Sequence, residues 1–230
     1  MDQLSFVTDT PTREALRTYR DLLVEHRAAA SLTSLQDPDE IDRRLVGEPL
    51  ILLDFLEARG VATSPAIDIG SGAGTPGLPI KIVRPALRIT LLEATAKKAV
   101  FLEKAVSALG VEDVEVVAAR AEELAHDPGH RESYQLALAR AVAPLPALIE
   151  IALPFLAVGG RLATPKGSSA RDEVAASANA LAMCGGEVEA VESMALPWEG
   201  VAPTVVIVRK VAETPDRYPR RPGIPAKRPL

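Results

Sequence analysis

The sequence predicts a doubly wound α/β protein in which a seven-stranded, mostly parallel sheet follows an N-terminal helical extension. Three observations lead to this fold class. Residues 1–60 show no strand pattern, and helical periodicity begins at residue 11. From residue 61 onward, short apolar runs alternate with helical segments, as in parallel sheets covered by helices. The first apolar run enters a glycine-rich turn, and ligands of doubly wound sheets bind at that end of the strands.

The first expected helix covers residues 11–30. Its apolar residues Leu16, Tyr19 and Leu23 recur at helical spacing and are expected to face a core. Residues 1–10 show no periodicity and are expected to fray.

The second expected helix begins at Asp37, because aspartate is a preferred N-cap and Pro38 follows at the first helical position. Gly47 and Pro49 are expected to break or kink it, since proline lacks the N–H that an internal helical residue donates. Helical character then continues over residues 50–58. Residues 1–60 are therefore predicted to form an acidic helical extension without strands.

Residues 61–212 are predicted to form the sheet domain. Strands are expected at residues 66–69, 88–92, 114–117, 135–139, 161–164, 188–195 and 205–208. Helices are expected between them at residues 76–84, 96–109, 146–156 and 169–183. Gly110 ends the second of these helices, and two glycines at 159 and 160 are expected to end the third.

Residues 213–230 are predicted to form an extended, basic, proline-rich tail, because proline does not pair in a central strand. The whole chain has a net charge of −5, which argues against a nucleic-acid partner. However, residues 209–230 contain seven Lys or Arg against two acidic residues, so this segment is +5 and residues 1–208 carry −10. This charge asymmetry is compatible with a local basic patch on an otherwise acidic protein, so the net charge alone does not exclude nucleic-acid binding.

Composition excludes several classes of protein. A single cysteine, Cys184, excludes an internal disulfide and a cysteine-based zinc site. No apolar run approaches the ~20 residues that span a bilayer, and the N-terminus lacks a signal-peptide pattern, so a cytoplasmic protein without a membrane partner is expected. His126 and His130 lie with Asp127 in a polar loop that offers no preformed metal geometry, so no metal is expected.

The turn after the first predicted strand contains glycines at alternate positions: Gly70, Gly72 and Gly74, preceded by Asp68. A dinucleotide fingerprint requires Gly or Ala at the sixth position, where this chain has Thr75. The turn instead resembles the S-adenosylmethionine loop of class I methyltransferases. An NAD-dependent oxidoreductase and a plain turn remain as alternatives.

Charged residues follow the other predicted strands. Glu93 ends the second strand, where an acidic side chain can accept hydrogen bonds from ribose hydroxyls. Glu122 follows the third strand, on the side where this fold places an adenine ring. For Glu93 and Glu122 alike, the alternative is a solvent-exposed carboxylate in the first turn of a helix, with no ligand to bind. Arg140 and Lys166 follow the fourth and fifth strands at the same edge.

These residues belong to longer motifs. Residues 68–80 read DIGSGAGTPGLPI, residues 91–98 read LLEATAKK, and residues 218–230 read YPRRPGIPAKRPL. Together with RAEE at 120–123, ARAVA at 139–143 and KG at 166–167, they resemble bacterial ribosomal RNA small subunit methyltransferase G, also called glucose-inhibited division protein B. The resemblance covers about residues 12 to 230. It implies the seven-stranded, Rossmann-like fold of class I methyltransferases.

The resemblance implies transfer of a methyl group from S-adenosylmethionine to N7 of a guanine in 16S ribosomal RNA, near the decoding region. The cofactor contacts expected from the motifs and the glycine turn are Asp68, Gly70, Gly72, Gly74, Thr75, Glu93, Ala94, Thr95, Ala121, Glu122 and Arg140. Arg140 and Lys166 are the candidate catalytic residues. Candidate RNA contacts, a hypothesis that rests on charge, are Lys97, Lys98, Arg120, Lys166, Arg220, Arg221, Lys227 and Arg228.

The expected partner is 16S rRNA in the small ribosomal subunit or an assembly intermediate, with the enzyme acting as a monomer. A small-molecule methyltransferase and a non-catalytic relative that binds S-adenosylmethionine or RNA are the alternatives. Three segments depart from the family pattern: residues 44–49 lack the His and Ser of its Arg-His-x-x-Asp-Ser motif, residues 202–204 lack an Arg-His pair, and Gln135 replaces a carboxylate. Trp198 is expected to be a packing or lid residue.

Overall fold

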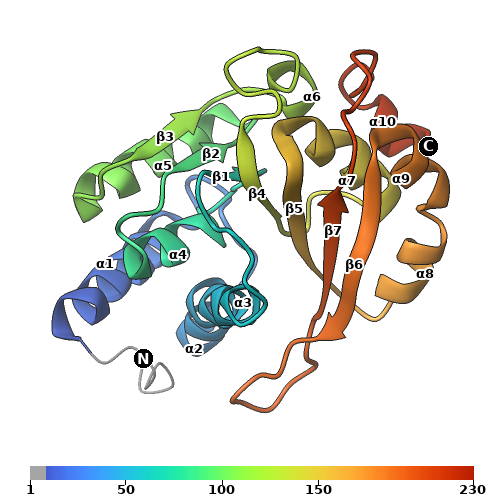
Figure 1. The fold of residues 1–230 in the computed structure, drawn as a ribbon. Coiled ribbons are helices and arrows are strands. Elements are labelled where there is room, and N and C mark those ends of the chain that lie inside the picture. Colours follow the sequence, from blue (N-terminus) through green and yellow to red (C-terminus); the bar gives the residue numbers. More distant parts are fainter. Residues whose placement is uncertain (1–8) are drawn as a thin grey trace.

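The computed structural model describes residues 9–230 and contains one seven-stranded sheet with strand order β3-β2-β1-β4-β5-β7-β6 (Figure 1). The first five strands are parallel, and β7 lies antiparallel between β5 and β6. The strands are β1 Ala66–Ile69, β2 Ile89–Leu92, β3 Val114–Val117, β4 Tyr134–Ala139, β5 Leu156–Lys166, β6 Gly186–Ser193 and β7 Thr204–Lys210. The predicted fold class is confirmed.

Helices cover both faces of the sheet. They are α1 Thr10–His26, α2 Pro38–Ile41, the π-helix η1 Asp42–Gly47, α3 Glu48–Glu57, α4 Gly77–Val83, α5 Ala96–Leu109, α6 Ala121–Leu124, α7 Leu145–Ala152, the 3₁₀ turn η2 Leu153–Phe155, α8 Ala170–Ala175, α9 Ala178–Cys184 and α10 Ile224–Lys227. One apolar core lies under α1, α3, α4 and α5, and a second lies under α7 and α9 on the opposite face. No helix among residues 9–230 is long and apolar enough to cross a membrane.

The N-terminal extension is helical, as expected. Asp9 caps α1 by accepting a 2.8 Å hydrogen bond from the Thr12 N–H, and α1 buries Leu16, Tyr19 and Leu23. It ends at His26, four residues before the expected end. The expectation that residues 1–10 fray falls mainly on residues 1–8, which lie outside the described part of the chain.

The break expected at Gly47 and Pro49 takes the form of the π-helix η1. The Glu48 N–H donates to the carbonyl of Arg43, five residues back. The next donor in this register would be residue 49, but proline has no N–H. The carbonyl of Arg44 therefore has no backbone donor of that register and is available to groups outside the helix.

Two predicted helices are wrong in extent. The expected helix 146–156 ends at Ala152, because Pro154 cannot donate within it, and β5 begins already at Leu156 and runs through both glycines. The expected helix 169–183 is two helices, α8 and α9. The Ser177 hydroxyl lies between them and donates to the Glu173 carbonyl at 2.6 Å, competing with the helical N–H.

The C-terminal segment is folded rather than extended, so that part of the prediction is wrong. Tyr218 is buried, and α10 packs against α7. Arg131 donates to the carbonyls of Thr214 and Tyr218. Prolines exclude this segment from the sheet, but side chains of the sheet domain supply the hydrogen bonds that hold it on the surface.

Candidate active site

The glycine turn lies at the carboxyl ends of β1 and β2. Gly70, Gly72 and Gly74 have φ values of +68°, +56° and +91°, the left-handed region that favours glycine. A Cβ added at Gly72 would meet only the Gly70 carbonyl oxygen, at 3.7 Å, so this position faces open space. A Cβ at Gly77 would lie 2.7 Å from Leu91 and 2.8 Å from Asp68, so that glycine lets α4 pack against the sheet.

Asp68 lies beneath the turn and is 1% exposed. Its Oδ2 accepts a 2.9 Å hydrogen bond from the Gly77 N–H, whereas its buried Oδ1 has no hydrogen-bond partner among the described residues. Burial raises the pKa of Asp68 to about 7. A buried carboxyl below an open glycine cradle suits a ligand that carries positive charge, and S-adenosylmethionine carries a sulfonium. The residues present therefore fit that cofactor.

Glu93 joins the glycine turn to the turn after β2. Its Oε2 accepts from the Gly72 N–H at 2.9 Å, and its Oε1 accepts from the Thr95 N–H at 2.7 Å. Each carboxylate oxygen has a second lone pair, so Glu93 retains the capacity to accept from ribose hydroxyls. Ala94 and Thr95 are exposed beside it.

The N-terminal helices hold the glycine turn from the outside. The Tyr19 hydroxyl on α1 donates to the Ala73 carbonyl at 3.0 Å, and the Thr75 hydroxyl donates to the Leu45 carbonyl on η1 at 3.1 Å. Burial raises the pKa of Tyr19, which keeps its hydroxyl a donor. In the sequence, Tyr19 is only one of the apolar positions of a helix, so no pattern predicted its hydrogen bond to Ala73.

Replacing Tyr19 by phenylalanine is expected to weaken S-adenosylmethionine binding several-fold and to lower the free energy of unfolding by about 1 to 3 kcal/mol, because the buried Ala73 carbonyl loses its donor. Calorimetry and thermal denaturation measure the two effects. Tyr218→Phe is the matched control, since it removes from a buried ring a hydroxyl that has no hydrogen-bond partner among the described residues. Equal cofactor affinity in Tyr19→Phe and wild type would contradict a positioning role.

Arg140, at the end of β4, connects the sheet to η1 and α3. Its guanidinium donates to Glu48 Oε2 at 2.9 Å and to the Arg44 carbonyl that Pro49 leaves without a backbone donor. Both side chains of the ion pair are 16% exposed. Burial lowers the pKa of Arg140 and raises that of Glu48. From the sequence, Glu48 stood out only as part of residues 44–49, a segment that departs from the family pattern.

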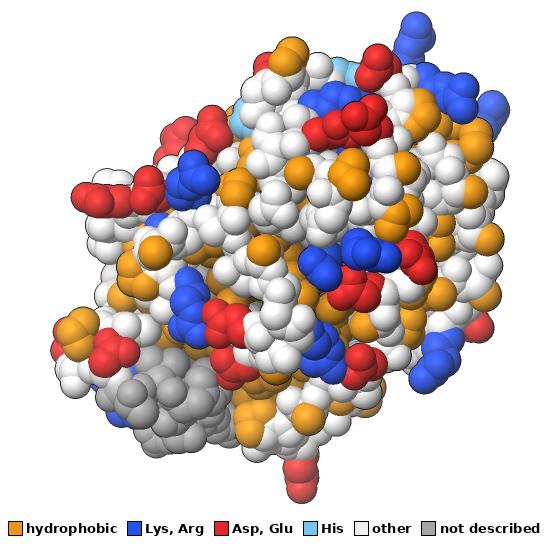
Figure 2. Space-filling model, viewed as in Figure 1, with side chains coloured by type: hydrophobic (Ala, Val, Ile, Leu, Met, Phe, Trp, Pro, Cys, Tyr) orange, Lys and Arg blue, Asp and Glu red, His pale blue; other side chains and the backbone are white. Residues whose placement is uncertain are grey.

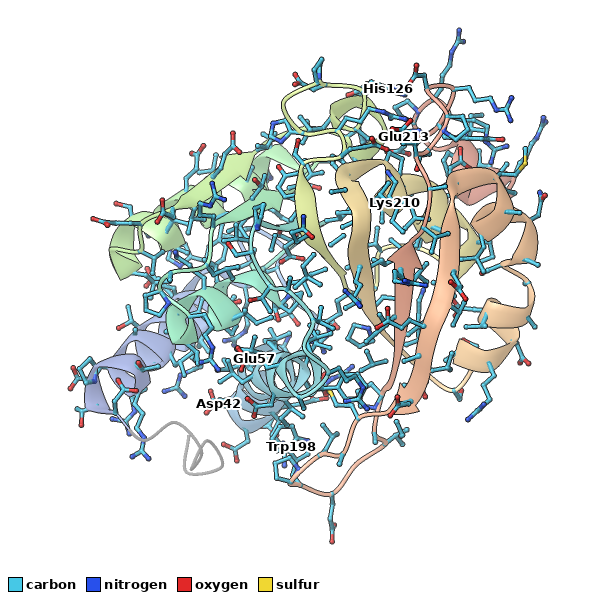
Figure 3. All side chains as sticks on the ribbon, viewed as in Figure 1. Asp42, Glu57, His126, Trp198, Lys210 and Glu213 are labelled. Atoms are coloured by element: carbon cyan, nitrogen blue, oxygen red, sulfur yellow. The ribbon has the colours of Figure 1, made fainter. Side chains whose placement is uncertain are left out.

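A cavity of about 910 Å³ opens beside this ion pair. Its walls are η1, the β4–α7 loop, the end of β5 and the β6–β7 connection. Trp198, on that connection, lies close to α2 and α3 in Figure 3, and a Cβ at Gly47 would be 2.7 Å from its ring. Gly47 thus lets the ring lie against η1 and close one wall. The lining residues are Asp37, Glu40, Arg43, Arg44, Glu48, Arg140, Ala141, Val142, Ala143, Pro144, Pro165, Lys166, Gly167, Glu173, Leu196, Trp198, Glu199, Gly200, Val201, Ala202 and Pro203.

This geometry agrees with comparisons to known proteins. The family model described as rRNA small subunit methyltransferase G matches residues 12–199. A protein named ribosomal RNA small subunit methyltransferase G from Pelotomaculum thermopropionicum is 40% identical over 97% of this chain and 92% of its own. One of the same name from Roseiflexus castenholzii is 49% identical over 87% of this chain and 84% of its own.

The chain belongs to the rRNA small subunit methyltransferase G family. Solved structures agree on the fold: a putative O-methyltransferase from Klebsiella pneumoniae has a TM-score of 0.56 at 14% identity, covering 84% of this chain and 90% of its own. A putative S-adenosyl-L-methionine-dependent methyltransferase from Methanococcus maripaludis has a TM-score of 0.54 at 16% identity, covering 76% and 91%. The expected family, fold and S-adenosylmethionine cofactor are confirmed.

In this member of the family, Lys166 holds the β4–α7 loop. Its ammonium donates to the Ala143 carbonyl at 2.7 Å and lies 3.0 Å from Glu173, and the side chain is 11% exposed. The lysine expected to be catalytic and to contact RNA is therefore bonded within the protein. Its geometry is that of a residue that positions one cavity wall.

The remaining cations expected at the RNA surface lie on three segments. Lys97 and Lys98 lie in the first turn of α5, and Arg120 precedes α6. Arg221, Lys227 and Arg228 are exposed on the C-terminal segment, where Lys and Arg side chains gather at the upper right of Figure 2. Across the rest of that view, positive and negative side chains are intermixed.

Two expected functional residues are bonded to other parts of the protein. The Arg220 guanidinium and N–H donate to Glu150 on α7 at 2.6 to 2.8 Å. Glu122, half-buried next to Ala121, accepts from the Gly223 N–H at 2.8 Å. Among residues 9–230, no group of three or more His, Cys, Asp or Glu side chains is placed to hold a metal ion.

Proposed function

We propose that this methyltransferase transfers a methyl group from S-adenosylmethionine to N7 of a guanine in 16S rRNA, near the decoding region. The observation that carries the proposal is the cavity beside Arg140. One of its lining residues, Val142, lies 3.0 Å from the Cβ position of Gly70 in the glycine turn, and none of the lining residues is a histidine or cysteine. Guanine N7 has a lone pair and no proton, so its methylation needs no general base. Positioning then supplies most of the catalysis.

The nucleophile that methylation of a pyrimidine at C5 needs is missing from this cavity. The thiol of Cys184 lies on α9, under the opposite face of the sheet, and is buried. Burial raises its pKa to about 12, so it stays protonated at neutral pH. This observation favours a nitrogen acceptor.

S-adenosylmethionine, when bound, supplies a methyl group on a positively charged sulfur. The residues proposed to hold it are Asp68, Gly70, Gly72, Gly74, Thr75, Glu93, Ala94, Thr95, Ala121, Glu122 and Arg140. Glu93 orients the glycine turn, the extension fixes Ala73 and Thr75 from outside, and Arg140 ties the β4 end to η1. The chain's own contribution is thus a rigid frame around the reacting atoms.

We further propose that the enzyme acts as a cytoplasmic monomer, without a metal, on the small subunit or an assembly intermediate. Exposed cations lie on three segments of an otherwise acidic molecule: Lys97 on α5 beside the half-buried Lys98, Arg120 before α6, and Arg221, Lys227 and Arg228 on the C-terminal segment. Such local charge gives weak affinity for free RNA and leaves recognition to the shape of the particle.

The test supplies labelled S-adenosylmethionine together with small subunits from a strain that lacks this enzyme. Label is expected in 16S rRNA, in a nucleoside that mass spectrometry identifies as N7-methylguanosine. Label in another nucleoside would contradict the N7 assignment, and no label in RNA would contradict the proposed substrate and favour a small-molecule acceptor.

Cofactor affinity is expected to rise with pH between about 6 and 8. The pKa of Asp68 is raised to about 7, so the carboxyl is largely neutral below that pH and ionised above it, and the ionised form attracts the sulfonium. Without cofactor, the free energy of unfolding has the opposite pH dependence. Between the pKa of Asp68 in the unfolded chain and its pKa of about 7 in the folded protein, the carboxyl is protonated only in the folded state, so stability falls as pH rises. Calorimetry across pH measures the affinity. Asp68→Asn is expected to remove this pH dependence, and an unchanged profile in that variant would contradict it.

A further inference from the structure

The cavity that the proposed function assigns to the acceptor base has five carboxylates in its lining. Asp37 and Glu199 are exposed at its rim, and Glu40 pairs with Arg44 where their side chains are 42% and 50% exposed. Exposed carboxylates are solvated and mobile, so they discriminate poorly between ligands. Only Glu48 and Glu173 are held inside the cavity.

Both oxygens of Glu173 are already bonded to groups of the protein. Its Oε1 accepts from the Ser169 hydroxyl at 2.8 Å, and its Oε2 accepts from the Leu145 N–H at 2.7 Å and faces the Lys166 ammonium. These contacts hold the start of α7 and α8 together. Glu173 is therefore a structural carboxylate.

Glu48 differs from the other four carboxylates. Arg140 fixes its orientation through Oε2, and the side chain is 16% exposed. Its Oε1 has no hydrogen-bond partner in the described part of the chain, and the residue lines the cavity. A half-buried, oriented acceptor with an open oxygen selects a ligand that presents an N–H.

Guanine presents such donors on its N1–H and 2-amino group, on the edge away from N7. We propose that Glu48 determines the specificity of this enzyme for guanine, with Oε1 accepting hydrogen bonds from that edge of the acceptor base. Adenine has an acceptor at N1 and no 2-amino group, so it would leave the carboxylate unsatisfied. This inference rests on the proposed function and goes beyond it in assigning the base-reading residue.

The charge change during the reaction favours the same assignment. The N7 lone pair forms the new N–C bond, the C–S electron pair stays on sulfur, no proton moves, and the positive charge passes to the guanine ring. A carboxylate fixed against the ring stabilises that developing charge, and it also compensates the neighbouring Arg140 cation.

The experiment uses 16S rRNA transcripts in which a small fraction of guanosine is replaced by inosine, assembled with small-subunit proteins. Inosine keeps N7 but lacks the 2-amino group. After methylation, the ratio of N7-methylinosine to N7-methylguanosine, compared with the input ratio, gives the relative kcat/KM for the two bases in one tube. The wild type is expected to prefer guanosine by roughly tenfold or more, as a lost base-edge contact implies.

Glu48→Gln is expected to prefer guanosine by less than about threefold, because its amide oxygen stays on Arg140 and its NH₂ group then faces the donor edge of guanine. Cofactor affinity, measured by calorimetry, and the melting temperature show whether the variant is folded and binds S-adenosylmethionine like the wild type. Glu199→Gln is the matched control: it makes the same change at the exposed rim and is expected to keep the wild-type preference.

Equal preference in Glu48→Gln and wild type would overturn the inference while leaving the proposed function standing. The wild-type arm needs no variant to fold: if the wild type accepts inosine as readily as guanosine, the 2-amino contact is disproved. Absence of N7-methylguanosine altogether would instead overturn the proposed function, so the two failures are distinguishable.

Discussion

Replacing Gly72 by valine is expected to lower the affinity for S-adenosylmethionine at least a hundredfold, which corresponds to about 3 kcal/mol of binding free energy. A Cβ at this position meets no protein atom closer than the Gly70 carbonyl oxygen at 3.7 Å, so the added side chain would extend into the space that the turn leaves for the cofactor. The Gly72 N–H also anchors Glu93, and a displaced backbone would release that carboxylate.

The substitution also strains the backbone, because a β-branched residue at φ +56° costs of order 1–3 kcal/mol of stability. Gly110→Val is the matched control, since Gly110 has φ +60° and open space around its Cβ position, yet it lies at the far end of α5. Both variants are expected to melt at similar temperatures, and only Gly72→Val should fail to bind the cofactor in calorimetry. Near-normal affinity in folded Gly72→Val would contradict the placement of the cofactor at this turn.

The fold was predictable because its signals are local. Strand–helix alternation identified the sheet, and the motif around Gly70 marked the strand end where ligands bind. The errors in helix bounds arose where one local sequence pattern is compatible with two secondary structures. The apolar run around Leu156 suits a helix end or a strand, and Pro154 decides between them by removing a helical donor. At Ser177 a single hydroxyl divides what the periodicity shows as one helix.

The candidate site was predictable only in part, for a related reason. Asp68, Glu93 and Arg140 each follow a strand of a parallel sheet, and the topology alone brings such ends together. Tyr19 and Glu48 reach the site from helices 54 and 92 residues away from the groups they contact. No local spacing encodes those contacts, so only the folded chain reveals that the extension supports the glycine turn and supplies a carboxylate to the cavity.

Charge was the feature most easily misread from the sequence. The basic C-terminal segment predicted an RNA-binding tail, yet Arg220 is occupied by Glu150, a carboxylate with 0% side-chain exposure. Three hydrogen bonds from one residue to one buried carboxylate hold the segment against α7. Part of the positive charge therefore stabilises the fold, and the exposed neighbours Arg221, Lys227 and Arg228 remain proposed RNA contacts.

Replacing Arg220 by alanine is accordingly expected to lower the free energy of unfolding by about 3 kcal/mol, the low end of the range for breaking a buried ion pair. The low end applies because Arg220 itself is 30% exposed, so water enters more readily beside Glu150 once the guanidinium is gone. Denaturant titration measures the loss. Cofactor affinity is expected to stay near the wild-type value, since Glu150 lies on α7 rather than at the glycine turn.

Arg221→Ala is the matched control in the adjacent position, where the side chain is exposed and makes no hydrogen bond or ion pair with any residue between 9 and 230. It is expected to change stability by less than about 0.5 kcal/mol, the usual size for a surface substitution, and to weaken RNA binding at low salt. If Arg220→Ala instead keeps the wild-type stability and is defective only in RNA binding, Arg220 contacts RNA, as the sequence predicted. Because the two arginines are neighbours of equal charge, a difference in stability between the two variants reports the contacts of the Arg220 guanidinium, which donates to the buried Glu150 carboxylate and to the Arg228 carbonyl.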